Sequence, residues 1–323
     1  MNATLYLLAA YGTALAAAVL TVLAFGWIWG GTSFGEWGYH HLIAGLAADV
    51  VATIVVFGFS QAARNSSVYD PYWSVAPPLL LAYWIITAGE VPVERVLVAL
   101  AITCVWAWQL TRNWALRWRG LADEDWRYSD IRRRSGRWFP LSDLFGIQMM
   151  PTLLVFGGMV PLYHATRATA PLNVIDMLAL IVVVVAIAIE MTADSQLRTF
   201  IKQRAAGIEG IGARLRSGLR AHARHPNYFG EISFWWGIAL FGFAASEARA
   251  WWLFGGAIAI LLLFNFISVP LMNARGLARH DWYRQHMAET RALVPLPRGR
   301  QHLVAPALLA AAFAATTLYV LLA

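Results

Sequence analysis

Residues 173–193 read NVIDMLALIVVVVAIAIEMTA, an almost unbroken apolar run that carries two acidic residues and no basic one. A helix needs about 20 apolar residues to cross the hydrocarbon core of a bilayer. Backbone N–H and C=O groups cannot stay unpaired in lipid, so such a run is expected to be helical. This stretch therefore predicts a membrane-spanning helix.

The composition of the whole chain supports the same class of protein. Of its 323 residues, 59% are hydrophobic and 13% are charged, whereas soluble domains carry about 25% charged residues. That leaves too little polar surface for an ordinary water-soluble protein. The net charge of +7 suits nucleic acid or a membrane surface, and its distribution favours the membrane. Cys104 is the only cysteine, which excludes an intrachain disulfide and a multi-cysteine metal site.

Further apolar runs predict an all-α fold, a polytopic membrane helix bundle with about nine transmembrane helices. The third and fourth runs are short and are separated only by residues 89–92. The predicted spans are residues 5–30, 41–61, 75–92, 94–111, 146–163, 173–193, 229–246, 250–272 and 303–323.

Positive charge predicts the orientation of these helices. The segments after the second, fourth, sixth and eighth spans carry 1, 8, 7 and 6 Lys or Arg residues, which sum to 22 of the 25 in the chain. The other side holds Arg95, Arg167 and Arg249. By the positive-inside rule we expect a bacterial inner-membrane protein with a cytoplasmic N-terminus.

The basic loops also contain aromatic, proline and acidic residues, for example residues 123–128 and 280–283. Charge that serves membrane insertion alone would need only one or two arginines per loop. We therefore predict that three cytoplasmic loops form a folded cap that binds a cofactor, although topology alone is the alternative explanation.

The most informative motif is GLRAHARHPNYFGE at residues 218–231. A basic turn containing proline leads directly into a helix, whose N-terminal N–H groups favour an anion. Arg224 and His225 add donors, and the Asn227 amide suits a carboxamide. Glu231 enters the apolar layer, where a carboxylate needs a partner. An ordinary interfacial turn is the alternative interpretation.

This motif resembles a signature of the steroid 5-alpha-reductase-like superfamily of membrane enzymes, which includes sterol reductases and isoprenylcysteine carboxyl methyltransferases. Two other stretches are similar to the reductases: DSQLRTFIK at residues 194–202, and RGLARHDWY at residues 275–283 with LVP at residues 293–295. The paired glutamates of the methyltransferases have no counterpart in residues 273–275. The resemblance covers about residues 40–297.

The resemblance implies NADPH as cofactor, with Asn227 at the nicotinamide carboxamide and Tyr283 against the adenosine. Arginine donors suit the phosphates. The chain contains no Gly-x-Gly-x-x-Gly turn, so a Rossmann site is not expected. The cofactor-binding residues that the resemblance implies are Asp194, Arg198, Lys202, Arg224, His225, Asn227, Tyr228, Glu231, Arg275 and Tyr283.

The segment expected to contact the substrate is RNSSVYDPYWS at residues 64–74, and it is assigned by its position alone. Reduction of an enone needs a donor on the carbonyl oxygen, and a Tyr hydroxyl held by a carboxylate is suitable. Steroid reductases use a Gln-Glu pair and a Tyr on the next span, but residues 106–113 contain no tyrosine. We therefore expect Tyr69, Asp70 or Tyr72 to be the catalytic donor, with an interfacial aromatic belt as the alternative.

Two other polar features leave alternatives open. Asp49 lies within a predicted span and is either a functional residue or a partner in a hydrogen bond between helices. His222 and His225 are spaced like metal ligands, but no carboxylates accompany them, so no metal site is expected.

The predicted function is NADPH-dependent reduction of a carbonyl-conjugated C=C bond in a lipid-soluble, steroid- or isoprenoid-like substrate. The expected partners are this substrate and membrane lipids, not nucleic acid. Residues 41–302 would form the reductase-like domain, and residues 1–40 and 303–323 would add one transmembrane helix each. The alternatives are an S-adenosylmethionine-dependent membrane methyltransferase and a non-enzymatic lipid-binding or transport protein.

Overall fold

The computed structural model describes residues 2–36, 38–208, 214–246 and 249–295. In these residues the secondary structure is helical, without a strand, so the all-α prediction is confirmed for them. The chain divides into two compact units, Met1–Pro171 and Leu172–Ala323. This division lies inside the predicted central domain of residues 41–302, whose own boundaries stay predictions.

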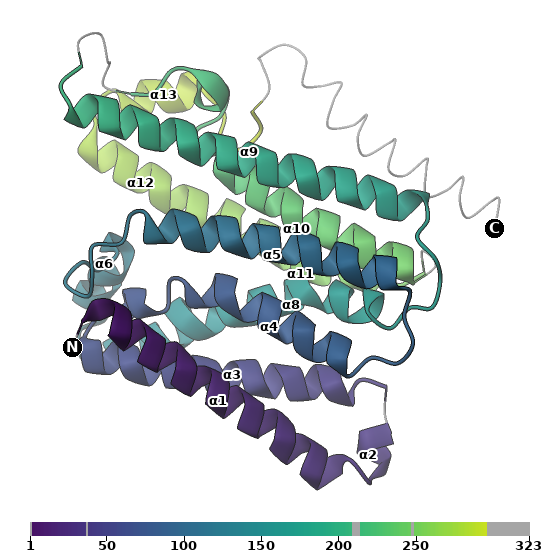
Figure 1. Cartoon of the computed structure of the whole chain (residues 1–323). Helices are drawn as coiled ribbons and strands as arrows, with labels where there is room; N and C mark the ends of the chain where they lie inside the picture. The colour runs from purple at the N-terminus through teal and green to yellow at the C-terminus, as the bar shows by residue number, and fades with distance from the viewer. Residues whose placement is uncertain (1, 37, 209–213, 247–248, 296–323) are drawn as a thin grey trace. The chain divides into compact units, whose positions relative to one another are not determined.

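Unit 1 is built from long helices joined by short helical turns (Figure 1). At the start of the first helix, the Asn2 side chain accepts a hydrogen bond from the Thr4 N–H at 3.0 Å and so caps the helix. Pro92 is the residue directly before the helix Val93–Ala115. Its elements are α1 (Ala3–Trp29), α2 (Ser33–Glu36), α3 (His40–Ala63), η1 (Ser66–Val68), α4 (Tyr72–Ile86), α5 (Val93–Ala115), α6 (Trp126–Ser135), η2 (Gly136–Trp138), α7 (Phe139–Ser142), the π-helix η3 (Asp143–Met149) and α8 (Met150–Ala165).

Hydrogen bonds between side chains and distant backbone groups hold α1 against α3 and the turn that follows it. The Tyr6 hydroxyl donates to Phe59 O at 2.6 Å, and the Tyr11 hydroxyl donates to Val68 O at 2.8 Å. The outer surface of α1 remains apolar, with Leu20 66% and Trp27 88% exposed. In a membrane protein such side chains face lipid.

Unit 2 begins with the longest helix among the described residues, which contains residues 174–193 of the predicted apolar run. Asn173 and Asp176 form a capping box that satisfies the free N–H groups at its start. The elements of unit 2 are α9 (Val174–Ala205), η4 (Gly218–Ala221), α10 (Pro226–Ala245), η5 (Trp251–Phe254), α11 (Gly255–Leu263), the π-helix η6 (Phe264–Ser268), α12 (Val269–Arg279) and α13 (Tyr283–Glu289).

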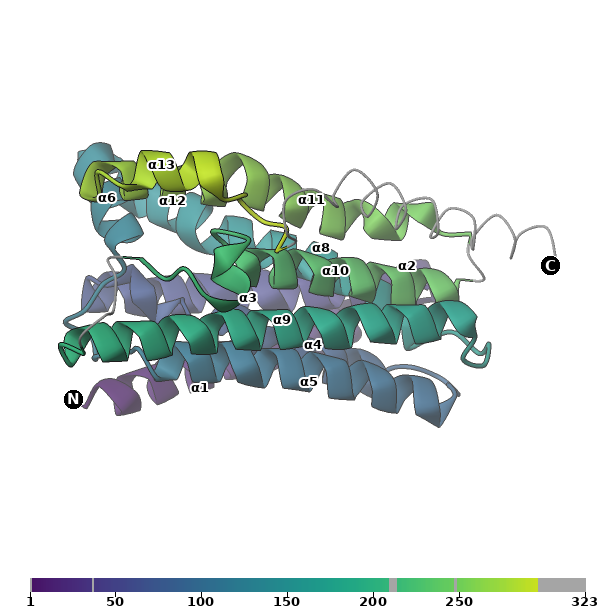
Figure 2. The ribbon, with the colours of Figure 1, turned by 90° about the horizontal axis from the view of Figure 1, so that it is seen from above.

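Helices α9 and α10 lie side by side in both views of the chain (Figure 1 and Figure 2). Two glycines of α10 allow this close approach. A Cβ on Gly230 would lie 2.8 Å from Ala186 O, and a Cβ on Gly237 would lie 2.5 Å from a Val183 methyl group. Small residues at a helix interface let membrane helices pack closely, so Gly230 serves helix packing.

Six helical segments among the described residues are long and apolar enough to cross a membrane, so the predicted count of nine is not confirmed. Helix α4 has 15 residues, or about 22 Å at 1.5 Å per residue, and is too short to qualify. Helix α10 is also not among them, and the predicted span 303–323 lies outside the described residues. The six are Ala3–Trp29, His40–Ala63, Val93–Ala115, Trp126–Ala165, Val174–Ala205 and Trp251–Arg279.

Candidate functional site

In unit 2 the two predicted cofactor segments, before α10 and after α12, come together. The Arg224 N–H donates to Arg291 O at 2.8 Å, and the His225 N–H donates to Ala292 O at 2.9 Å. Ala223 and Arg291 form a short parallel bridge. Segments about 65 residues apart in sequence therefore share one backbone connection, which places their side chains in one cluster.

This cluster contains buried nitrogen atoms without a hydrogen-bond partner among the described residues. They belong to Arg214 (Nε and Nη1), Arg220 (Nε), Arg224 (Nε), His225 (Nε2) and His286 (Nδ1). A buried donor without a partner costs about 1–3 kcal/mol. Several in one cluster form a set of polar nitrogens that would suit a ligand with many acceptor oxygens.

Burial and neighbouring positive charges lower the pKa values of the two histidines in the cluster. Burial, and then the charges of Arg220 and Arg224, lower the pKa of His225 to about 4. Burial, and then Arg214 and Arg224, lower the pKa of His286 to about 4. Both imidazoles are therefore neutral at pH 7, and the arginines supply the positive charge that an anion needs.

Backbone carbonyls hold two of these arginines in place. Arg224 Nη1 donates to Thr290 O and, at 3.4 Å, to Met287 O. Arg220 Nη1 donates to Arg224 O at 2.7 Å. Burial lowers the pKa of both guanidinium groups. Carbonyl oxygens position the side chains without neutralising their charge, although the nearby Asp194 partly offsets the charge of Arg220.

Three members of the cluster, Arg214, Arg220 and His286, are not among the predicted site residues. Arg220 lies within the quoted motif, and its spacing of four residues from Arg224 was a signal that could have identified it. Arg214 forms an ion pair with Glu289 at 2.5 Å, and its guanidinium lies 5.8 Å from the Trp282 ring centroid. The ion pair links positions 75 residues apart, and neither contact is visible in the sequence.

Tyr283 and Tyr228 pack against neighbouring side chains of unit 2. The Tyr283 hydroxyl donates to Asn273 Oδ1 at 3.1 Å, and its ring covers Gly276 so closely that a Cβ there would lie 2.4 Å from it. The Tyr228 ring stacks on His225 with centroids 5.2 Å apart. Arg275 is half-buried on α12.

The remaining predicted cofactor residues lie on α9 and α10. Asp194 acts electrostatically on Arg220, Arg198 is half-buried, and Lys202 is exposed at the end of α9. Asn227 is half-buried in the first turn of α10. Buried Glu231 accepts a hydrogen bond from Trp235 Nε1 at 2.8 Å, which supplies a partner for the carboxylate in the apolar layer.

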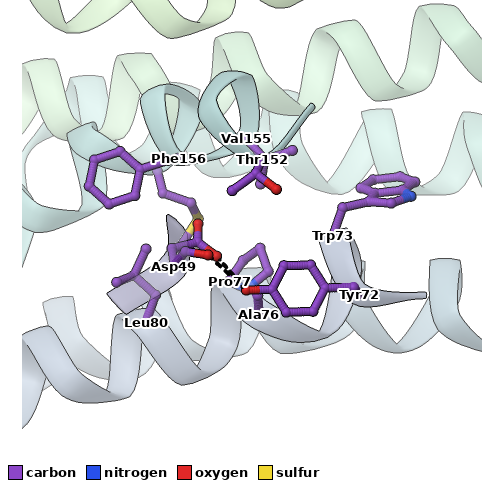
Figure 3. Close-up of a pocket in the computed structure, with 10 residues that line it drawn as sticks. Asp49, Tyr72, Trp73, Ala76, Pro77, Leu80, Thr152, Val155 and Phe156 are labelled. Carbon is purple, nitrogen blue, oxygen red and sulfur yellow. Dashed lines mark hydrogen bonds between the residues drawn. The ribbon is translucent and has the colours of Figure 1, made fainter. Parts of the chain in front are cut away.

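In unit 1, Tyr72 and Asp49 form a polar pair in an apolar setting. The Tyr72 hydroxyl donates to Asp49 Oδ1 at 2.7 Å (Figure 3). Beside them lies a cavity of about 10 Å³, room for about one water molecule. Apart from Asp49, Tyr72 and Thr152, apolar and aromatic side chains of α4 and α8 line it. The hydrogen bond that the sequence suggested for Asp49 is thus present, on a cavity wall.

Tyr69 and Asp70 make different contacts. The Tyr69 side chain is 1% exposed, and its hydroxyl lies 2.8 Å from Thr152 Oγ1. Asp70 Oδ1 accepts from the Tyr128 hydroxyl at 2.6 Å. Burial raises the pKa of Asp70 to about 6, while the Tyr128 hydrogen bond opposes that rise. Of the three predicted donors, Tyr72 lines the cavity, while Tyr69 and Asp70 hold the surrounding structure.

The loop that carries Tyr69 and Asp70 is connected to the loop after α5. The Asn65 amide donates to Leu121 O at 2.8 Å, the Ser66 N–H donates to Glu124 Oε1 at 2.9 Å, and the Asp125 N–H donates to Ser67 Oγ at 2.9 Å. One of the predicted cap loops therefore folds against the predicted substrate segment in unit 1. Among the described residues, no three His, Cys, Asp or Glu side chains are grouped to hold a metal.

One comparison with known proteins found a match. The model of a family described as "Protein of unknown function (DUF1295)" matches residues 56–290. Searches of curated proteins and of solved structures found no match. The matched region includes every predicted site residue and the arginine–histidine cluster, but it does not include α1 or Asp49.

Proposed function

The chain belongs to the DUF1295 family, a family of unknown function, and we propose that it is an NADPH-dependent membrane reductase. Its substrate would be a lipid-soluble compound with a C=C bond conjugated to a carbonyl group. The observation that carries the proposal is the cluster of buried arginine and histidine nitrogens without partners among the described residues of unit 2. The steroid 5-alpha-reductase-like resemblance supplies the type of reaction.

The donor set fits a dinucleotide that carries an additional phosphate. Phosphate oxygens accept charge-assisted hydrogen bonds, and planar guanidinium groups provide them in pairs. Arg214, Arg220 and Arg224 would contact phosphates together with the neutral imidazoles of His225 and His286. Arg275, Arg198 and Lys202 would add charge at the same end of unit 2.

The resemblance assigns the non-phosphate parts of the cofactor. Asn227, at the start of α10, would bind the nicotinamide carboxamide, and Tyr283 would pack on the adenosine. Asp194 would accept a hydrogen bond from a ribose hydroxyl. Bound NADPH would supply the hydride, which no side chain of the protein can provide.

Unit 1 supplies the acid that such a reduction needs. When hydride reaches the β-carbon of an enone, negative charge develops on the carbonyl oxygen, and a hydrogen-bond donor there lowers the barrier. Tyr72 is the candidate, because its hydroxyl lies on the cavity wall. In the free protein its single O–H donates to Asp49, so donation to the substrate would require this proton to turn to the carbonyl oxygen and a protonated Asp49 to donate to the phenol oxygen. The surrounding apolar side chains would strengthen this hydrogen bond by excluding water.

The cavity also limits how a substrate binds. A site for a ligand of steroid size has a volume of about 300–1,000 Å³, whereas this cavity measures about 10 Å³. Substrate binding would therefore require α4 and α8 to separate locally. Pro77, in the middle of α4 on the cavity wall, breaks one helical hydrogen bond there and makes such a local movement easier.

Thermal unfolding of the detergent-solubilised protein with different cofactors tests this proposal. NADPH should raise the unfolding midpoint more than NADH, since one or two extra charge-assisted bonds improve affinity about ten- to a hundredfold. Equal stabilisation by both would remove the role of the 2′-phosphate. Stabilisation by S-adenosylmethionine alone would instead support a methyltransferase, and no stabilisation by any of these would reject the enzyme proposal.

The same proposal includes an orientation in the membrane. We propose a bacterial inner-membrane location with the N-terminus, the arginine–histidine cluster and the loop of residues 116–125 on the cytoplasmic side. The charge count of the loops supports this orientation. A cytoplasmic position would give the cluster access to the soluble pool of NADPH.

A further inference from the structure

A second basic surface lies in unit 1, where α6 turns into the helical run that leads to α8 (Figure 1). Residues 132–137 contain four arginines. Directly after them come three exposed apolar side chains, Trp138 at 59%, Leu141 at 49% and Phe145 at 59%. The surface thus changes from strongly basic to apolar within a few residues, at the start of a membrane-spanning segment.

Only part of this positive charge is neutralised by the protein. Arg132 forms an ion pair with Glu124 at 2.7 Å, and Arg133 forms one with Asp130. Arg134 and Arg137 form no ion pair with a residue that the structure describes, and both are exposed. Two positive charges therefore remain available to an external anion.

The surface is held in a defined conformation. The Arg132 guanidinium lies over the buried Phe139 ring, 3.9 Å from its centroid. The Ser142 hydroxyl donates to Ser135 Oγ at 3.0 Å and links the end of α6 to α7. Phe139 faces inward, so the neighbouring Trp138 faces outward, where Arg137 lies 5.3 Å from its ring centroid.

The spacing of charged and apolar residues matches the layers of a bilayer. Arg137 and Leu141 are four residues apart, about 6 Å along a helix. The polar headgroup layer of one leaflet is about 5–8 Å thick. With Leu141 and Phe145 in hydrocarbon, Trp138 lies at the boundary, as tryptophan prefers, and Arg137 lies among the headgroups.

From this geometry we propose that Arg134, Arg137 and Trp138 form a binding site for the headgroup of an anionic phospholipid. The arginines pair with the phosphate and other acidic groups, while Trp138, Leu141 and Phe145 contact the acyl chains. A soluble polyanion would gain nothing from these apolar side chains, which favours lipid. The proposal does not depend on reductase activity.

Native mass spectrometry of the full-length protein with phosphatidylglycerol and phosphatidylcholine tests the site. One arginine near an anionic surface improves affinity about fivefold. Arg134→Gln with Arg137→Gln should therefore weaken phosphatidylglycerol binding about 25-fold and leave phosphatidylcholine binding unchanged. Arg134→Lys with Arg137→Lys should retain most of the preference. Asp130→Asn, which releases Arg133, should strengthen phosphatidylglycerol binding up to about fivefold.

Arg117→Gln with Arg119→Gln is the matched control, because it removes the same charge from exposed positions elsewhere in unit 1. It should change phosphatidylglycerol binding by less than about twofold, since it leaves the proposed contacts intact. Equal losses in both double variants would overturn the proposal. So would displacement of phosphatidylglycerol by millimolar inorganic phosphate, which would show a simple anion site.

Discussion

The hydroxyl group of Tyr72 donates a hydrogen bond to Asp49 Oδ1 at 2.7 Å and so connects α4 to α3. Both side chains line the cavity of unit 1. A carboxyl group in an apolar environment is costly without a hydrogen-bond partner, and Tyr72 supplies that partner. In the proposed enzyme the Tyr72 proton would turn from Asp49 to the substrate carbonyl oxygen, and a protonated Asp49 would donate to the phenol oxygen.

Tyr72→Phe is expected to leave NADPH binding unchanged and to lower turnover of an enone substrate by about two to three orders of magnitude, the loss of one oxyanion donor. Tyr83→Phe is the matched control, since Tyr83 belongs to the same helix but hydrogen-bonds to His41 at 2.9 Å. Single-turnover NADPH oxidation is the measurement. Equal turnover in both variants would assign the proton donor elsewhere.

Arg275→Ala is expected to weaken NADPH binding by about 1.5–3 kcal/mol, because a phosphate loses a charge-assisted hydrogen bond. Arg279→Ala is the control, since Arg279 lies one turn further along α12 and is exposed. Isothermal titration calorimetry measures both. A similar affinity for the two variants would exclude Arg275 from the cofactor site.

NADPH binding is expected to be accompanied by proton uptake. The pKa values of His225 and His286 are about 4 without a ligand, and a nearby phosphate would raise both. Affinity should therefore increase as pH falls through the bound-state pKa values. Calorimetry at pH 6 and pH 8, in two buffers of different ionisation enthalpy, measures this uptake. His225→Gln with His286→Gln should remove it, whereas the same uptake in that variant would contradict the assignment.

The stability that Asp70 contributes is expected to fall as pH rises from 4 to 7, because the pKa of Asp70 is about 6 in the folded protein and 3.8 without burial. His225 and His286, whose pKa values burial lowers, contribute in the opposite direction. A raised folded-state pKa stabilises the protein at low pH, and this contribution is lost as pH rises through 6. The loss amounts to about 3 kcal/mol. In thermal unfolding, the stability of Asp70→Asn should change with pH by about 3 kcal/mol in the favourable direction relative to the unaltered protein as pH rises over this range, because the Asp70 titration is removed. The substituted amide oxygen can still accept the Tyr128 hydrogen bond. A dependence identical to that of the unaltered protein would contradict the prediction.

Topology reporters test the proposed orientation. Fusions of alkaline phosphatase at Arg134 and Arg216 should be inactive, because the positive-inside rule retains both segments in the cytoplasm. A fusion at Arg167 should be active and serves as the control. Phosphatase activity at Arg134 or Arg216 would reverse the orientation and remove access of NADPH to the cluster.

The hydropathy of the chain was sufficient to predict most of its long helices. Residues 41–61 fall inside α3, and residues 174–193 fall inside α9 with Asn173 as its N-cap. Helical backbone hydrogen bonds are local, and apolar length is read directly from the sequence. Hydropathy was less reliable for residues 75–92. The helix there is Tyr72–Ile86. The predicted bounds differ from these because an apolar run does not show at which capping and turn residues a helix begins and ends.

The sequence also singled out two segments as predicted contacts for an anionic cofactor, because residues 218–231 and 275–283 each carry several donors in a short stretch. The grouping of Arg214, Arg220 and His286 with them required the folded chain. So did the pairing of Asp49 with Tyr72, 23 residues away. Such contacts depend on how helices rotate and pack against one another, and thus on many side chains at once, which no local sequence pattern encodes.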